Sequence, residues 1–160
     1  MNRITLILAT VLSLAFTQVT AQDFSKGVEA LEADDFATAL KEFKPLAEQG
    51  NAEAQNNLGY MYEYGKGVLK DVTEAAKWNR LSAEQGNANG QYKLAMRHLK
   101  GEGVLQDYAE TLKWLRLSAE QGGGFYSTTA QAFLGIMYEY GDGVLQDNVT
   151  AHMWYNIASA

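Results

Sequence analysis

The sequence contains no cysteine, one proline and two histidines among its 160 residues. Without cysteine, a disulfide scaffold, a thiolate nucleophile, a thiolate metal site and a lipid-modified cysteine anchor are all excluded. Basic residues are also in the minority, because 13 Lys and Arg stand against 19 Asp and Glu and give a net charge of −6. Such a surface repels a phosphate backbone, so we expect no nucleic-acid partner.

The two histidines, His98 and His152, lie far apart in the sequence and belong to no cluster of carboxylates. A metal site or a Ser-His-Asp arrangement needs ligands that converge, and no spacing in this sequence predicts one. We therefore expect no metal, no cofactor and no catalytic residue, with His98 as a packing residue. A hydrolase acting in the periplasm stays as the least favoured alternative.

Long apolar runs are also scarce, and the single one follows Arg3 at the N-terminus. It extends over Ile4–Phe16, which is too short to span a bilayer comfortably. Val19-Thr20-Ala21 then offers the residues that a signal peptidase recognises. We predict that residues 1–21 are a signal peptide and that the exported protein is periplasmic or secreted. An uncleaved membrane anchor is the alternative. The sequence has no second apolar segment, so we expect no integral membrane segment in the mature chain.

Glycine is abundant, and it recurs at regular intervals. The seven residues Gly65–Asp71 return in similar form as Gly101–Asp107 and again as Gly141–Asp147. One tryptophan follows each copy at a constant distance, and these are Trp78, Trp114 and Trp154. The first two copies are 36 residues apart and the last two are 40 apart. A period of this size indicates a repeat architecture.

Glu-Gln-Gly endings at Gly50, Gly86 and Gly122 divide the chain at the same period. This division predicts a helical half repeat at residues 22–50, followed by three repeats at 51–86, 87–122 and 123–160. The third repeat contains a four-residue insertion. We expect the insertion zone, Gly122–Tyr126, to be a mobile loop that exposes Phe125 or Tyr126, with Ser127 as the N-cap of the next helix.

Each repeat is predicted to contain two helices. In the first repeat, one helix runs from about Ala52 to Tyr64, and a second begins after Asp71, which forms a capping box with Glu74. Because one helix pair cannot bury its apolar face alone, stacked pairs predict an all-α superhelical solenoid, with the tryptophans in structural roles. In the segment before Gly50, we expect Pro45 to kink or break the helix.

The motif between Leu58 and Gly86 resembles the Sel-one-like repeat, an α/α relative of the tetratricopeptide repeat. The resemblance rests on paired glycines, an aspartate and a tryptophan that keep one register three times, and it extends over Phe36–Ala160. Leu69 departs from the family pattern, which often has proline there. The resemblance implies a non-catalytic scaffold or adaptor that binds a protein or peptide. A structural, self-assembling envelope protein is the alternative.

By analogy with tetratricopeptide repeats, the first helix of each pair lines a concave face. If Leu58, Leu94 and Leu134 are buried anchors, side chains two positions away lie about 200° round the helix and face the groove. The predicted binding residues at these positions are Asn56, Tyr60, Tyr92, Met96, Ala132 and Ile136, and Glu63, Leu99 and Glu139 follow one turn further along. An exposed apolar strip with acidic margins would suit an extended peptide or an amphipathic helix with basic flanks. Alternatively, the row packs against a neighbouring helix.

Overall fold

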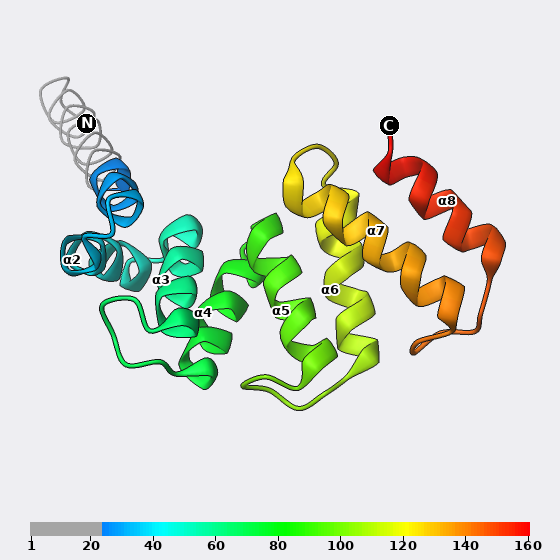
Figure 1. Ribbon diagram of the computed structural model, residues 1–160, viewed down its shortest axis with the longest axis horizontal. Coiled ribbons are helices and arrows are strands. Elements are labelled where there is room, and N and C mark those ends of the chain that lie inside the picture. Colours follow the sequence, from blue (N-terminus) through cyan, green and yellow to red (C-terminus); the bar gives the residue numbers. More distant parts are fainter. Residues whose placement is uncertain (1–23) are drawn as a thin grey trace, which may run out of the picture.

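The computed structural model describes residues 24–160, which form a row of stacked helices (Figure 1). Residues 24–32 are helical, and the labelled helices that follow are α2 (Phe36–Glu48), α3 (Ala52–Tyr64), α4 (Val72–Glu84), α5 (Ala88–Lys100), α6 (Tyr108–Glu120), α7 (Phe125–Tyr140) and α8 (Asn148–Ala158). No strand occurs in this part of the chain. The predicted all-α fold class is confirmed, whereas the predicted signal peptide lies outside the described residues.

The helices pack as successive pairs along the chain. α3 packs against α4, α5 against α6 and α7 against α8, and each pair also packs against the next (Figure 1). The first helices of successive pairs touch one another as well, because α5 contacts both α3 and α7. We refer to the surface formed by α3, α5 and α7 as the first-helix face.

Polar side chains cap the start of α2 to α6 and of α8. The side chain of Asn51 accepts a hydrogen bond from the Ala54 amide at the start of α3, and Asn87 does the same for α5. Asp71 caps α4 through its bonds from the amides of Thr73 and Glu74, as predicted. The expected reciprocal half of the capping box is wrong, because the Asp71 amide donates to the Tyr62 carbonyl at 3.0 Å instead.

The two glycines of each Gly-x-Gly motif have different structural roles. The first ends the first helix in the left-handed conformation, with φ of +68°, +70° and +78° at Gly65, Gly101 and Gly141. The second lies against the start of the preceding repeat's second helix. A Cβ at Gly67, Gly103 or Gly143 would overlap Phe36, Val72 or Tyr108, respectively. The motif therefore ends one helix and also joins neighbouring repeats.

Small residues on the first helices face larger ones on the second helices. A Cβ at Gly59 would meet the Asn79 amide, and one at Gly135 would meet the Tyr155 ring. Gly27 lies in the same way against the Phe43 ring. Residues 24–50 therefore form a helix pair with the same small-against-large packing as the later repeats.

The break expected at Pro45 is wrong, because α2 continues from Phe36 to Glu48. Pro45 and Lys41 are both exposed, so water can solvate the Lys41 carbonyl oxygen that has lost its amide donor. On the opposite side, Phe43 and Leu46 are buried and hold α2 against the core. Burial of that apolar stripe outweighs the lost hydrogen bond.

The insertion zone is divided, because Gly122–Gly124 stay outside any helix and the residues that follow lengthen α7. α7 has 16 residues, whereas α3 to α6 have 13 each, and it begins at Phe125 with Gly124 as its N-cap. Ser127 is buried inside the helix, so its predicted N-cap role is wrong. Phe125 is 76% exposed, as expected. Tyr126 is half-buried, with its ring 5.7 Å from that of Tyr92.

Candidate protein-interaction site

The nine predicted binding residues lie on α3, α5 and α7, but they are not equally accessible. Asn56 is only 6% exposed, so the expectation that it faces an open groove is wrong. Ile136 is 38% exposed. The remaining seven are half-buried, and they are Tyr60, Glu63, Tyr92, Met96, Leu99, Ala132 and Glu139. The rule of two positions from each leucine therefore finds an accessible surface on α5 and α7 and is wrong for the start of α3.

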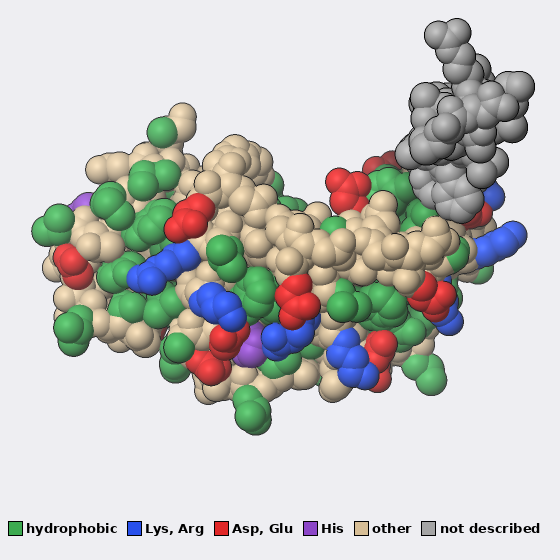
Figure 2. All heavy atoms as spheres, turned by 180° about the vertical axis from the view of Figure 1, so that it is seen from behind, with side chains coloured by type: hydrophobic (Ala, Val, Ile, Leu, Met, Phe, Trp, Pro, Cys, Tyr) green, Lys and Arg blue, Asp and Glu red, His purple; other side chains and the backbone are tan. Residues whose placement is uncertain are grey.

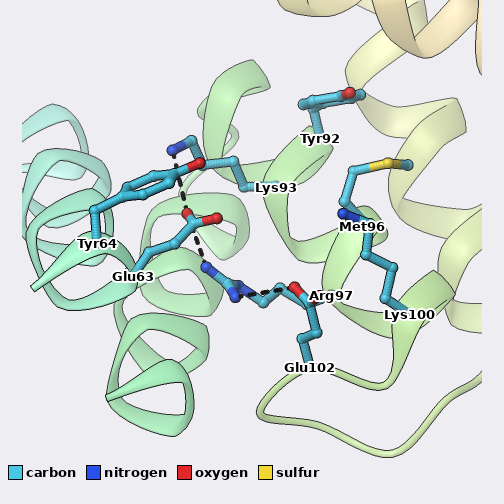
Figure 3. Close-up of a pocket in the computed structure, with 8 residues that line it drawn as sticks. All are labelled: Glu63, Tyr64, Tyr92, Lys93, Met96, Arg97, Lys100 and Glu102. Carbon is cyan, nitrogen blue, oxygen red and sulfur yellow. Dashed lines mark ion pairs between the residues drawn. The ribbon is translucent and has the colours of Figure 1, made fainter. Parts of the chain in front are cut away.

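A pocket of about 160 Å³ lies between α3 and α5 (Figure 3). Its lining comprises Glu63 and Tyr64 from α3, Tyr92, Lys93, Met96, Arg97 and Lys100 from α5, and Glu102 from the loop that follows. Glu63, Tyr92 and Met96 are among the predicted binding residues. Lys93 and Arg97 were missed, because they lie one position before and three after Leu94 and point toward α3 (Figure 3).

One carboxylate in this pocket faces two cations. Glu63 Oε2 lies 2.8 Å from Arg97 Nη2 and 3.7 Å from Lys93 Nζ. Arg97 Nη1 is 3.6 Å from Glu102 Oε2. The Arg97 side chain is 3% exposed and that of Lys93 is 17% exposed, so both charges are largely removed from water.

Burial is the dominant influence on Lys93. It lowers the pKa of the Lys93 ammonium, and the nearby Glu63 carboxylate offsets only part of that effect. With Lys100, the pocket has three cationic side chains for the two carboxylates Glu63 and Glu102. The predicted acidic margin is therefore wrong at this end of the face, where positive charge is in excess.

The glutamate at the other end of the face is also engaged. Glu139 accepts a hydrogen bond of 2.6 Å from the Tyr155 hydroxyl. This bond raises the pKa of Tyr155 to about 12, because removal of the phenolic proton would break it and set two negative charges side by side. Glu139 thus bonds to the second helix of its own repeat, contrary to the expectation of a free acidic margin.

Aromatic rings lie on both sides of the pocket. On α3, the rings of Tyr60 and Tyr64 are 4.8 Å apart, and Lys93 Nζ lies 5.1 Å from the Tyr60 ring. On α5, the Tyr92 ring is 6.0 Å from that of Phe133 on α7. The first-helix face therefore combines aromatic contact area with a buried, positively charged pocket, a combination that is typical of interaction sites.

Both ring nitrogens of His98 lie close to polar atoms of neighbouring elements. The His98 Nδ1 lies 3.2 Å from the Leu105 carbonyl oxygen, and its Nε2 lies 3.4 Å from an Arg80 nitrogen. Tyr138, at the same repeat position, likewise accepts a hydrogen bond from Arg116. Between residues 24 and 160, no group of three His, Asp or Glu side chains could hold a metal ion. In that same range, no helix has the length and apolar character needed to cross a membrane.

The repeats of this chain match one protein family. The Sel1 repeat model matches residues 52–87, 88–123 and 128–160. The chain belongs to the Sel1 repeat family. The resemblance inferred from the glycine and tryptophan register is thereby confirmed. No curated protein matches the chain.

Solved Sel1 structures share this fold. A Sel1 repeat protein from Oxalobacter formigenes is 31% identical, with a TM-score of 0.78, over 86% of this chain and 53% of its own. A protective antigen present in uropathogenic Escherichia coli strains, which displays an SLR fold, is 33% identical with a TM-score of 0.81. That match covers 91% of this chain and 31% of the antigen. This Sel1 repeat chain thus spans about half the length of the Oxalobacter formigenes protein and about a third of the length of the antigen.

Sel1 repeat proteins are generally protein-interaction scaffolds and are typically non-catalytic. In this member, the repeat motif accounts for the helices, the caps and the joins between repeats. The residues that distinguish its pocket lie outside the motif. Arg97 occupies the repeat position at which Met61 and Met137 are buried core residues. A charged side chain at a core methionine position is the signal in the sequence that would have located the pocket.

Proposed function

We propose that this protein is a non-catalytic adaptor that binds a peptide or helix of another protein on its first-helix face. The main support is the pocket between α3 and α5, where aromatic rings flank an Arg97 side chain that is almost fully buried. Large side chains of the first-helix face are exposed at the pocket and beyond it, including Tyr64 on α3 and Ile136 and Tyr140 on α7. Exposed aromatic and apolar groups beside a charged pocket provide both contact area and orientation for a protein ligand.

The mixed charge of the surface also favours a protein partner. In Figure 2, hydrophobic, basic and acidic side chains alternate across the visible face, without a broad area of one sign. A nucleic-acid-binding protein concentrates Lys and Arg on one surface, and this chain has a net charge of −6. The mixed pattern suits a partner that is recognised by local contacts.

The binding proposal is tested by a matched pair of substitutions. Ile136 on α7 and Leu117 on α6 are 38% and 39% exposed, but only Ile136 belongs to the first-helix face. We expect Ile136→Glu to abolish capture of the partner from extracts of the native host, because it places a charge against apolar contacts. Leu117→Glu should leave capture unchanged. Equal capture by wild type and Ile136→Glu, with matching thermal melts, would contradict the proposal.

We also infer that the protein is exported, from the basic start, apolar run and small-residue site within residues 1–21. The expected result is a mature protein that begins at or near Gln22. Mass spectrometry of the protein from its native host measures this directly. Intact protein that retains Met1 in the soluble cytoplasmic fraction would overturn the inference.

Self-assembly is the second candidate, and one observation favours it. α8 exposes the apolar side chains of Val149, Met153 and Ile157, which recur every four residues along it. An exposed apolar helix face of this kind can pair with another copy of the chain. A sedimentation coefficient that rises with protein concentration would support self-assembly, and a constant monomeric value would exclude it.

A further inference from the structure

The pocket between α3 and α5 has the features of a carboxylate site. We propose that it binds the free carboxyl terminus of a partner protein whose last residue is apolar. The terminal carboxylate would lie against Lys93 and Arg97, and the terminal side chain would lie against Tyr92 and Met96. This inference rests on the proposed function, because it specifies the partner's chemistry on the same first-helix face.

Arg97 is the first reason. Its guanidinium has five N–H donors, and it is 3% exposed at a position where other repeats bury methionine. Among residues 24–160, its carboxylate contacts are Glu63 at 2.8 Å and Glu102 at 3.6 Å, and its Nη2 forms no aligned hydrogen bond. A buried guanidinium with unused donors is costly. An incoming carboxylate can accept two parallel N–H bonds from it.

Lys93 is the second reason. Its ammonium is 3.7 Å from Glu63, which is beyond hydrogen-bond length, and Glu63 already faces Arg97 at 2.8 Å. Burial lowers the pKa of Lys93, so the charge of its ammonium is incompletely compensated. A second carboxylate that reaches Lys93 and Arg97 from within the pocket would supply the missing negative charge.

The apolar wall and the size of the pocket indicate which carboxylate fits. Tyr92 and Met96 line the same pocket from α5, and Figure 3 shows their side chains pointing away from α3. A volume of about 160 Å³ holds a single side chain or ring and is smaller than a pocket for a drug-sized ligand. A C-terminal apolar residue presents a carboxylate and an apolar side chain on the same Cα. An internal Asp or Glu presents the charge without the apolar group.

The net charge of the protein limits which residues can precede the partner's terminal residue. Because the protein has a net charge of −6, an acidic tail would be repelled as it approached. We therefore expect the residues before the terminal one to be neutral or basic. The binding energy would come from one carboxylate held in a local excess of positive charge.

The test is an NMR titration of the purified protein with N-acetyl-Ala-Ala-Leu, first as the free acid and then as the C-terminal amide. We expect the acid to shift the amide resonances of Lys93, Met96 and Arg97, and the amide to bind at least about tenfold more weakly, because it lacks the charge. Glu63→Gln should bind the acid a few-fold more tightly, since a competing carboxylate is removed. If Glu63 had only a structural role, Glu63→Gln would bind the free acid with weaker or unchanged affinity.

Control variants separate the possible failures. Lys93→Met should lose the preference for the acid, whereas Lys113→Met, which removes the same charge from α6, should retain it. Equal shifts with acid and amide on the first-helix face would overturn the carboxylate site and leave the adaptor proposal standing. No shifts with either peptide would also overturn the carboxylate site, and the Ile136→Glu comparison would then decide the adaptor proposal independently.

Discussion

Gly103→Ala is expected to destabilise the protein far more than Gly101→Ala, although both glycines belong to one motif. Their φ angles are +75° and +70°, so each substitution incurs the strain of a left-handed residue, about 1–2 kcal/mol. Only at Gly103 would the new Cβ also overlap the carbonyl group of Val72 at the start of α4. Because a backbone group cannot move aside cheaply, we expect a further loss of about 1–3 kcal/mol there.

Urea unfolding of the two variants measures the difference. Gly123→Ala is a useful third variant, because Gly123 has φ of +63° and no atom lies within 4 Å of its added Cβ. It should behave like Gly101→Ala, since both report backbone strain without overlap. If all three variants lose the same free energy of unfolding, the second glycine does not join neighbouring repeats as described.

Trp114→Ala is expected to have the largest effect of any tryptophan substitution. Trp114 is 5% exposed within the core cluster of α5, α6 and α7, and its Nε1 donates a hydrogen bond of 2.8 Å to Glu110. Truncating a buried aromatic residue costs about 3–5 kcal/mol, which is a large share of a small domain's stability of about 5–15 kcal/mol. We expect the urea midpoint to fall sharply with an unchanged m value.

Trp154 provides the matched comparison, because it occupies the same repeat position on α8. Its side chain is half-buried, so Trp154→Ala removes less core contact and should cost clearly less than Trp114→Ala. Trp114→Phe retains most of the apolar bulk and should fall between wild type and Trp114→Ala. A loss at Trp154 equal to that at Trp114 would show that the repeat position, and not the depth of burial, determines the effect.

Local signals made most of the fold predictable. The predicted bounds of α3, Ala52–Tyr64, are confirmed because Asn51 caps one end and Gly65 ends the other in a left-handed conformation. Such signals act within a few residues and need no knowledge of tertiary contacts. The errors at Pro45 and Ser127 arose where burial decided the outcome. In α2 a buried apolar stripe held the helix together through Pro45, and in α7 Ser127 is itself buried inside a helix that begins two residues earlier.

The site was less predictable, because it depends on how the helices rotate against one another. Glu63 meets Lys93 and Arg97 across two different repeats, and no periodic pattern specifies that pairing. Asn56, which the angular rule had assigned to the groove, is buried in the packed structure. What the sequence does show is the substitution of Arg97 for a core methionine, which marks the repeat where the pocket lies.

Site-specific photo-crosslinking in the native host tests most directly whether the first-helix face binds a partner. A photoreactive phenylalanine analogue is placed at position 136 on α7 or at position 117 on α6, two sites of nearly equal exposure. We expect a crosslinked partner band from position 136 and none from position 117. A band from position 117 alone, or bands of equal yield from both positions, would contradict this expectation.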